Sequence, residues 1–339
     1  MKVLLRTEGD HSTGFGHVRR CLSLAEALRE IEVDCSFLID GDALAVEQAT
    51  TAGFPAWRVR GDESLRYTVE AARREIDCVV IDSYRVSSES WLSVADEPPT
   101  LVAIDDFGSY EIPAHVVVNS SFGGTSRSAI KGASVLCGPE YALLRAEFAE
   151  NPGRIRTRPY AERILITVGG SDPCGITPDL ISWAEAATSK AAIDVVVGPL
   201  FVNGRAIERL QSTRVRVHHN PRDMRSLMLA ADLAVCAGGQ TTFELAATGT
   251  PAVAVRVAAN QTDNLRGFAQ HRAIAWVGDA TDADLGSKVG QALAGLAVDS
   301  EVRREMSERG RALVDGHGST RVAEAIVRAT LGRKDLTES

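Results

Sequence analysis

The sequence has no apolar run long enough to cross a bilayer, and the apolar run near its N-terminus is too short for a signal peptide. It also lacks an excess of positive charge, since 45 Asp and Glu residues outnumber 37 Lys and Arg residues and leave a formal net charge of −8. A nucleic acid or an anionic membrane is therefore not expected as the main partner. We expect a cytoplasmic protein with no membrane partner, and the sequence leaves its oligomeric state open.

Closely spaced cysteine pairs are also missing. None of the six cysteines belongs to a Cys-x-x-Cys pair, and most stand in apolar segments. Buried free thiols are therefore expected rather than disulfides or zinc ligands. What the chain does have is an ordinary globular composition, with 45% hydrophobic and 24% charged residues, and its 339 residues allow two domains.

Short apolar runs alternate with amphipathic helical patterns along the whole chain. Strands are predicted at 3–5, 35–39, 78–81, 101–104, 115–118, 164–168, 193–197, 215–217, 233–236, 252–255 and 273–277. Because these runs do not alternate apolar with polar residues, they indicate parallel sheets covered by helices on both faces. Helices are predicted between them, among others over 63–75 and around 323–331.

A polar, proline-bearing stretch from 147 to 159 interrupts this alternation, which then starts afresh. We therefore predict two Rossmann-like α/β domains facing each other across a cleft. The predicted domains are residues 1–155 and 156–339, with the last helix able to pack back on the first domain.

The stretch from 233 to 251 is the most informative part of the second domain. An apolar strand leads through Gly238-Gly239 into a helix that begins with Gln240 and Thr241. Free backbone N–H groups and the positive end of a helix dipole then face one spot, which favours phosphate binding. Glu244 lies about one turn into the helix, where a carboxylate can accept hydrogen bonds from a ribose diol. A plain strand-to-helix turn, with Glu244 merely favourable near the helix N-terminus, explains this stretch about equally well.

A second glycine loop, Gly169-Gly170-Ser171, follows an earlier strand of the same domain and is expected to face the first. Two such loops in one domain are more specific than either alone. Asn260 and Gln261 follow the next strand and could supply polar groups to the same rim, although an ordinary solvated loop would also place them there.

In the first domain, the loop Gly14-Phe15-Gly16-His17 follows the first strand and opens a helix. It begins like a dinucleotide-binding fingerprint, but Arg19 stands where the third glycine is needed, so an oxidoreductase is disfavoured. The loop places His17 where it could act as a general base near neutral pH. A surface or helix-capping histidine is the alternative.

Polar residues follow the third and fourth strands of this domain. Asp82-Ser83-Tyr84 and Asp105-Asp106 both point to the sheet edge at which His17 is expected. The Asp105-Asp106 pair could bind a metal or orient His17, and it could equally cap the next loop, which is commoner for Asp after a strand.

Taken together, these segments resemble the nucleotide-sugar hydrolases of pseudaminic acid biosynthesis. These enzymes release UDP from UDP-2,4-diacetamido-2,4,6-trideoxy-β-L-altropyranose, and they share the two-domain GT-B fold with the lipid II-forming glycosyltransferase of peptidoglycan synthesis. The segments that carry the resemblance, in the family's order, are GFGHVRRCLSLAEAL (14–28), VVIDSYRV (79–86), AIDDF (103–107), GPEYALLRAEF (138–148), TVGGSDP (167–173), AGGQTTFELAATGTP (237–251) and AANQTDN (258–264).

The resemblance implies a role for each matching position. His17 would be the general base that activates water, and attack at the anomeric carbon would proceed with inversion. The substrate side would include Gly14, Gly16, Tyr84, Asp105, Asn260 and Gln261. The nucleotide would lie against Gly169, Gly170, Ser171, Gly238, Gly239, Gln240 and Thr241, with Glu244 at the ribose. We expect neither a metal nor an organic cofactor.

Two segments depart from the family pattern and leave the identity of the sugar open. Arg19 stands where a methionine is expected, and residues 7–10, Thr-Glu-Gly-Asp, are more acidic than is common there. A GT-B glycosyltransferase with a UDP-sugar donor is the first alternative, although we see no apolar or basic membrane-docking patch for a lipid acceptor. A nucleotide-sugar-binding protein without catalysis is the second. The sequence does not decide whether the C–O or the P–O bond is cleaved.

Overall fold

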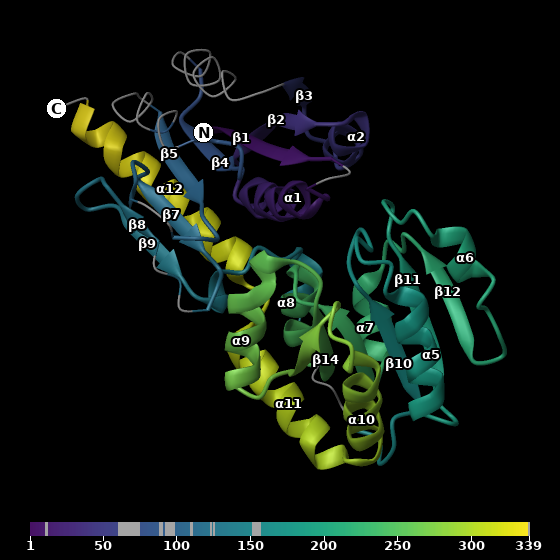
Figure 1. The fold of residues 1–339 in the computed structure, drawn as a ribbon. Coiled ribbons are helices and arrows are strands. Elements are labelled where there is room, and N and C mark those ends of the chain that lie inside the picture. Colours follow the sequence, from purple (N-terminus) through teal and green to yellow (C-terminus); the bar gives the residue numbers. More distant parts are fainter. Residues whose placement is uncertain are drawn as a thin grey trace. The chain divides into compact units, whose positions relative to one another are not determined.

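The computed structural model describes residues 1–10, 13–59, 75–87, 91, 99–108, 111–122, 124, 126–150 and 157–337. The predicted helix over 63–75 falls almost entirely outside these residues. The chain forms two compact units: Met1–Ala146 together with Gly316–Ser339 make the first, and Glu147–Asp315 make the second (Figure 1). The division after Ala146 lies nine residues before the predicted boundary, and the C-terminal segment belongs to the first unit.

The first unit is built on a seven-stranded sheet in the order β3-β2-β1-β4-β5-β7-β9, and every neighbouring pair is parallel. Its strands are β1 (Lys2–Gly9), β2 (Asp34–Gly41), β3 (Ala56–Val59), β4 (Cys78–Asp82), β5 (Thr100–Ile104), β7 (Val116–Asn119) and β9 (Ser134–Cys137). A separate two-stranded sheet joins β6 (Glu111–Ile112) to β8 (Arg127–Ser128). Five of these strands match predicted runs, whereas the half-exposed strands β3 and β9 at the two sheet edges were not predicted.

Three helices of the first unit are described: α1 (Gly16–Glu30), α2 (Ala43–Thr51) and α12 (Gly318–Thr337). The buried stripe of α1, which includes Val18, Cys21 and Leu24, packs on the sheet, and α12 packs along α1. Short 3-10 turns lie at Pro139–Tyr141 (η1) and Ala146–Phe148 (η2). The final helix therefore completes the unit that begins the chain.

The second unit has a six-stranded parallel sheet in the order β12-β11-β10-β13-β14-β15. Its strands are β10 (Arg163–Thr167), β11 (Ala192–Val197), β12 (Val215–His219), β13 (Leu233–Ala237), β14 (Ala252–Arg256) and β15 (Ala275–Asp279). Its helices are α5 (Thr177–Ala187), α6 (Gly204–Glu208), α7 (Met224–Ala230), α8 (Gln240–Thr248), η3 (Ala259–Gln261), α9 (Thr262–Gln270), α10 (Leu285–Val298) and α11 (Ser300–Leu313).

The six predicted strands of this unit are all present. An apolar core of this unit packs α5 and α10 against one face of the sheet, with Ile164, Leu180 and Leu293 among the buried residues. All six cysteines are free, and Cys21, Cys35, Cys78 and Cys236 are buried as predicted, while Cys174 is exposed. Among the described residues, no helix is both long enough and apolar enough to cross a membrane.

In each sheet the strand order reverses once. The chain moves from β1 outward to β2 and β3 and then returns to β4 beside β1, and in the second unit it returns to β13 beside β10. In open α/β sheets, ligands bind outside the carboxyl ends of the strands at this switch point. The fold thus singles out one position in each unit, between β1 and β4 and between β10 and β13.

Candidate active site

The candidate catalytic site lies at the switch point of the first unit. His17 stands in the first turn of α1, just beyond the end of β1, and Asp82 is the last residue of β4. Both side chains are buried, with 6% of His17 and none of Asp82 exposed. The Nδ1 atom of His17 lies 2.7 Å from Oδ1 of Asp82. A carboxylate at Nδ1 favours the tautomer in which that nitrogen carries the proton, which leaves Nε2 free to accept one.

Arg20, one turn further along α1, holds Asp82 in place. Its Nε and NH2 atoms donate to the two carboxylate oxygens of Asp82 at 2.6 and 2.5 Å. Burial alone would raise the pKa of Asp82, but Arg20 and His17 lower it well below its ordinary value. Asp82 is therefore an ionised acceptor rather than a proton donor at neutral pH.

Asp106 and Tyr84 close a ring of contacts around this pair. The NH1 atom of Arg20 donates to both oxygens of Asp106 at 2.9 and 2.8 Å, and the hydroxyl of Tyr84 donates to Asp106 at 2.5 Å. The Tyr84 ring then meets the imidazole of His17 edge-on, with the ring centroids 4.3 Å apart. Burial and the neighbouring Asp106 raise the pKa of Tyr84, so the phenol keeps its proton. Tyr84 therefore packs edge-on against the imidazole, while the Asp82 carboxylate favours the tautomer with the proton on Nδ1.

Asp105 points elsewhere. Its carboxylate accepts from the backbone N–H groups of Phe107 and Gly108 and from the Ser126 hydroxyl, at 3.1, 3.0 and 2.6 Å respectively. These are the contacts of an Asp that caps a turn after a strand, which was one of the three roles foreseen for the pair. Substrate contact by Asp105 stays a prediction. Asp106 is the member of the pair that contacts Arg20 and Tyr84, two residues that lie against His17.

The loop that precedes α1 is held by its own backbone and by Asp10. Thr13 N–H donates to Asp10 Oδ1 at 2.9 Å, and Gly14 N–H donates to Asp10 O at 2.8 Å. Gly14 has a φ of 73°, a left-handed conformation that favours glycine, whereas Gly16 has ordinary geometry and open space around it. The substrate contacts predicted for both glycines stay predictions.

In the second unit, the two predicted glycine loops flank the switch point. Gly169 and Gly170 follow β10, and Gly238 and Gly239 follow the neighbouring β13. Gly169 has a φ of 104°. At Gly238 a Cβ atom would lie only 2.5 Å from the side chain of Leu265, so a larger residue would force that side chain to shift. Because β10 and β13 are parallel neighbours, the two glycine loops that follow them lie at the same edge of the sheet, as expected.

The residues predicted around these loops fall into two groups. Gln261 is engaged, because its Oε1 atom accepts from Gly238 N–H at 3.2 Å and from Val257 N–H at 2.9 Å, while Asn260 is exposed. On α8, Gln240 and Glu244 are half-buried and Thr241 is buried, and Ser171 is half-buried beside Gly170. The nucleotide contacts assigned to these residues stay predictions.

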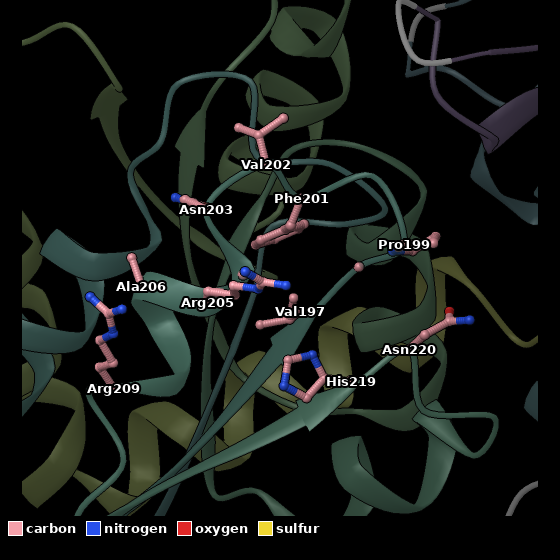
Figure 2. Close-up of a pocket in the computed structure, with 12 residues that line it drawn as sticks. Val197, Pro199, Phe201, Val202, Asn203, Arg205, Ala206, Arg209, His219 and Asn220 are labelled. Carbon is pink, nitrogen blue, oxygen red and sulfur yellow. The ribbon is translucent and has the colours of Figure 1, made fainter.

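A pocket of about 720 Å³ opens beside the Gly169-Gly170 loop (Figure 2). Val197 and His219, the last residues of β11 and β12, line it together with Phe201 and Arg205. Leu200, which stands between the lining residues Pro199 and Phe201, contacts the Gly169-Gly170 loop, because its N–H donates to Gly170 O at 3.0 Å. None of the described residues predicted for nucleotide binding lines this pocket. Across the described ranges, no group of three or more His, Cys, Asp or Glu side chains is arranged to hold a metal ion.

Comparison with known proteins relates the chain to carbohydrate-active proteins at low identity, and no family model matches it. It is 26% identical to an uncharacterized protein of Methanocaldococcus jannaschii over 75% of this chain, which spans only 55% of that relative. It is 25% identical over its full length, and over 99% of the relative, to the spore coat polysaccharide biosynthesis protein SpsG of Bacillus subtilis.

Two relatives are enzymes named for UDP-linked substrates. The chain is 26% identical to UDP-2,4-diacetamido-2,4,6-trideoxy-β-L-altropyranose hydrolase of Campylobacter jejuni, over 51% of this chain and 61% of that one. It is also 26% identical to UDP-N-acetylglucosamine–N-acetylmuramyl-(pentapeptide) pyrophosphoryl-undecaprenol N-acetylglucosamine transferase of Salinibacter ruber, over 94% of each chain. Among solved structures, Acinetobacter baumannii MurG superposes with a TM-score of 0.70 at 16% identity, covering 96% of this chain and 99% of that one. The predicted GT-B fold is thereby confirmed.

Sequence reasoning found the histidine but not the set of residues that surrounds it. Asp82 and Asp106 were placed at the correct sheet edge, yet their partners depend on which strands are neighbours. Arg20 was noted only within the segment 14–28, which carries the family resemblance, and Glu8 only within the acidic segment 7–10, which departs from it. Helical spacing was the available signal for Arg20, because residues three apart on a helix lie on one face.

Proposed function

We propose that the protein is a UDP-sugar hydrolase in which His17 is the general base. The observation that carries the proposal is the 2.7 Å contact between His17 Nδ1 and an ionised Asp82 at the switch point of the first unit. A fixed tautomer with a free Nε2 atom is what the removal of a proton from water requires. The similarity to the Campylobacter hydrolase supports this reaction, and we propose a diacetamido-trideoxy sugar as the substrate on that basis.

The proposed chemistry divides between the units. In the first unit, Nε2 of His17 takes a proton from water as the water oxygen attacks the anomeric carbon, with inversion at that carbon. The bond from the anomeric carbon to the diphosphate oxygen breaks, and UDP leaves with the electron pair. In the second unit, N–H groups of the Gly169-Gly170 and Gly238-Gly239 loops and the N-terminus of α8 bind the diphosphate, and Glu244 binds the ribose.

A glycosyltransferase is the second candidate, because the Salinibacter relative, named as a transferase, aligns over 94% of this chain. The same base could remove a proton from an acceptor hydroxyl instead of from water. The two reactions differ in whether UDP is released when no acceptor is present.

The test is to incubate the protein with a panel of UDP-sugars, without acceptor, and to follow UDP release. Turnover that is lost in His17→Asn, with UDP affinity unchanged, would support the hydrolase. UDP release only after an acceptor is added would establish a transferase. UDP binding without turnover under either condition would leave a binding protein and contradict both enzymatic proposals.

A further inference from the structure

A second buried carboxylate, Glu8, faces His17 from the opposite side to Asp82. Glu8 is the seventh residue of β1 and its side chain is fully buried. Its Oε1 atom lies 4.0 Å from Nε2 of His17, the nitrogen that Asp82 leaves free. The imidazole is therefore flanked by a carboxylate at each nitrogen, one in hydrogen-bonding contact and the other slightly beyond it.

Groups that follow β4 hold Glu8 in this position. Its carboxylate accepts from the Ser83 hydroxyl and, at 3.1 Å, from the Tyr84 backbone N–H, and Arg85 Nε lies 3.9 Å away. Because β1 and β4 are neighbours, these three consecutive residues fix the carboxylate relative to the imidazole. Tyr84 thus contacts both Glu8 and His17, through its backbone and its ring respectively.

The charges around this site are unequal. Asp82 and Asp106 share Arg20, while Glu8 shares Arg85 with Asp10 and Asp40, and Arg6 lies 3.5 Å from Asp40. Among the described residues, five carboxylates therefore surround three guanidinium groups, and a cationic imidazole would restore part of the balance. An anion within about 4–6 Å favours the charged form of a neighbouring histidine.

We propose that Glu8 is a positioning residue that stabilises the imidazolium formed when His17 takes the proton of the nucleophile. This inference rests on the proposed function, since it assigns Glu8 an effect through His17. Asp82 selects the tautomer, and Glu8 strengthens the base by placing negative charge beside the nitrogen that gains the proton. A buried carboxylate in the acidic segment that departs from the family pattern thereby acquires a role.

The test compares Glu8→Gln with the wild type in the full chain, using the UDP-sugar that the wild type hydrolyses. Glutamine keeps the shape and can still accept from the Tyr84 N–H, but it carries no charge. We expect kcat at the plateau to fall about tenfold and the acid limb of the kcat profile to move to lower pH by roughly one unit. KM and UDP affinity should change little. A lower plateau kcat together with an acid limb at lower pH distinguishes this role of Glu8 from a purely structural one.

Asp40→Asn is the matched control, because Asp40 pairs in register with Glu8 on β2 and shares Arg85 with it. It should move the acid limb less than Glu8→Gln does, because the Asp40 carboxylate faces Arg85 and Arg6 rather than the imidazole. If Glu8→Gln fails to fold, Glu8→Asp, which keeps the charge, should fold and move the limb less. A Glu8→Gln profile that matches the wild type in position, while His17→Asn is inactive, would overturn the role of Glu8 but not the proposed function. Full turnover in His17→Asn would overturn both.

Discussion

Replacing Asp82 by Asn tests the core of the site, because the change removes one acceptor while conserving shape. Asp82 now accepts from Arg20 Nε and NH2 and from His17, all within 2.7 Å. An asparagine has one side-chain oxygen, and the permanently charged Arg20 competes for it more strongly than a neutral imidazole does. The amide NH2 would then face Nδ1 of His17, so the proton would move to Nε2, the atom that must accept one.

The expected loss is that of a misplaced general base. Turnover should fall by about 10²–10⁴-fold, equivalent to roughly 3–5 kcal/mol of activation free energy. KM and the affinity for UDP should stay near their wild-type values, because the loops proposed to bind the nucleotide belong to the second unit. Steady-state UDP release and calorimetric titration with UDP measure the two quantities, at a temperature at which circular dichroism shows the variant to be folded.

The second unit supplies the matched control. Asp194 on β11 also lies 2.7 Å from a histidine, His218 Nε2, and is paired with Arg163. Asp194→Asn removes one carboxylate oxygen from a similar His–Asp–Arg group, so it should lower the free energy of unfolding but leave turnover unchanged. If Asp82→Asn retains turnover within a fewfold of the wild type, or if Asp194→Asn loses as much, the assignment of the base to the His17–Asp82 pair is refuted.

Four further outcomes are expected. Glu244→Ala should weaken UDP binding about 10- to 100-fold by calorimetry, because a charged hydrogen bond to the ribose is lost, and unchanged affinity would remove Glu244 from the site. Gly238→Ala should lower the free energy of unfolding by about 1–3 kcal/mol, since its Cβ would clash, whereas Gly239→Ala, with 3.8 Å to its nearest neighbour, should be tolerated. Turnover should survive exhaustive chelation, and a loss that magnesium restores would contradict this. Burial and Arg333 lower the pKa of His115 to about 4, so the unfolded state binds a proton more readily between pH 6.5 and 4. As the pH falls from 6.5 to 4, the free energy of unfolding measured by urea titration should therefore decrease by about 1–2 kcal/mol, a figure that allows for solvent screening at this half-buried ring. The decrease should be smaller in His115→Asn.

The fold could be predicted from the sequence because buried parallel strands are continuous apolar runs. The runs at 164–168 and 233–236 correspond to β10 and β13 within a residue or two at each end. The edge strands β3 and β9 were missed because half-exposed strands carry mixed polarity. The division between the two compact units falls after Ala146, nine residues before the predicted boundary.

The site could be predicted in part. His17 was selected because its glycine loop follows a strand, and the strand ends placed Asp82 and Asp106 at the same sheet edge. What the sequence could not show is how the charges pair: whether Arg20 binds one carboxylate or two, or that Asp105 and Asp106 point to different partners. Those choices depend on strand order and side-chain direction, which no spacing along the chain records.

The discontinuous first unit has a consequence for how the protein is made. Its closing helix, α12, is held to the segment before the second unit by Ser319, whose hydroxyl donates to Leu144 O at 2.7 Å, and by Arg321, which donates to Glu140 O at 2.9 Å. Gly318 packs so tightly on Ala142 that a Cβ atom would meet its backbone at 2.2 Å. On the ribosome, the second unit therefore emerges complete while the first still lacks its final helix. Synthesis of the unit that carries His17 therefore starts before that of the second unit and is completed after it.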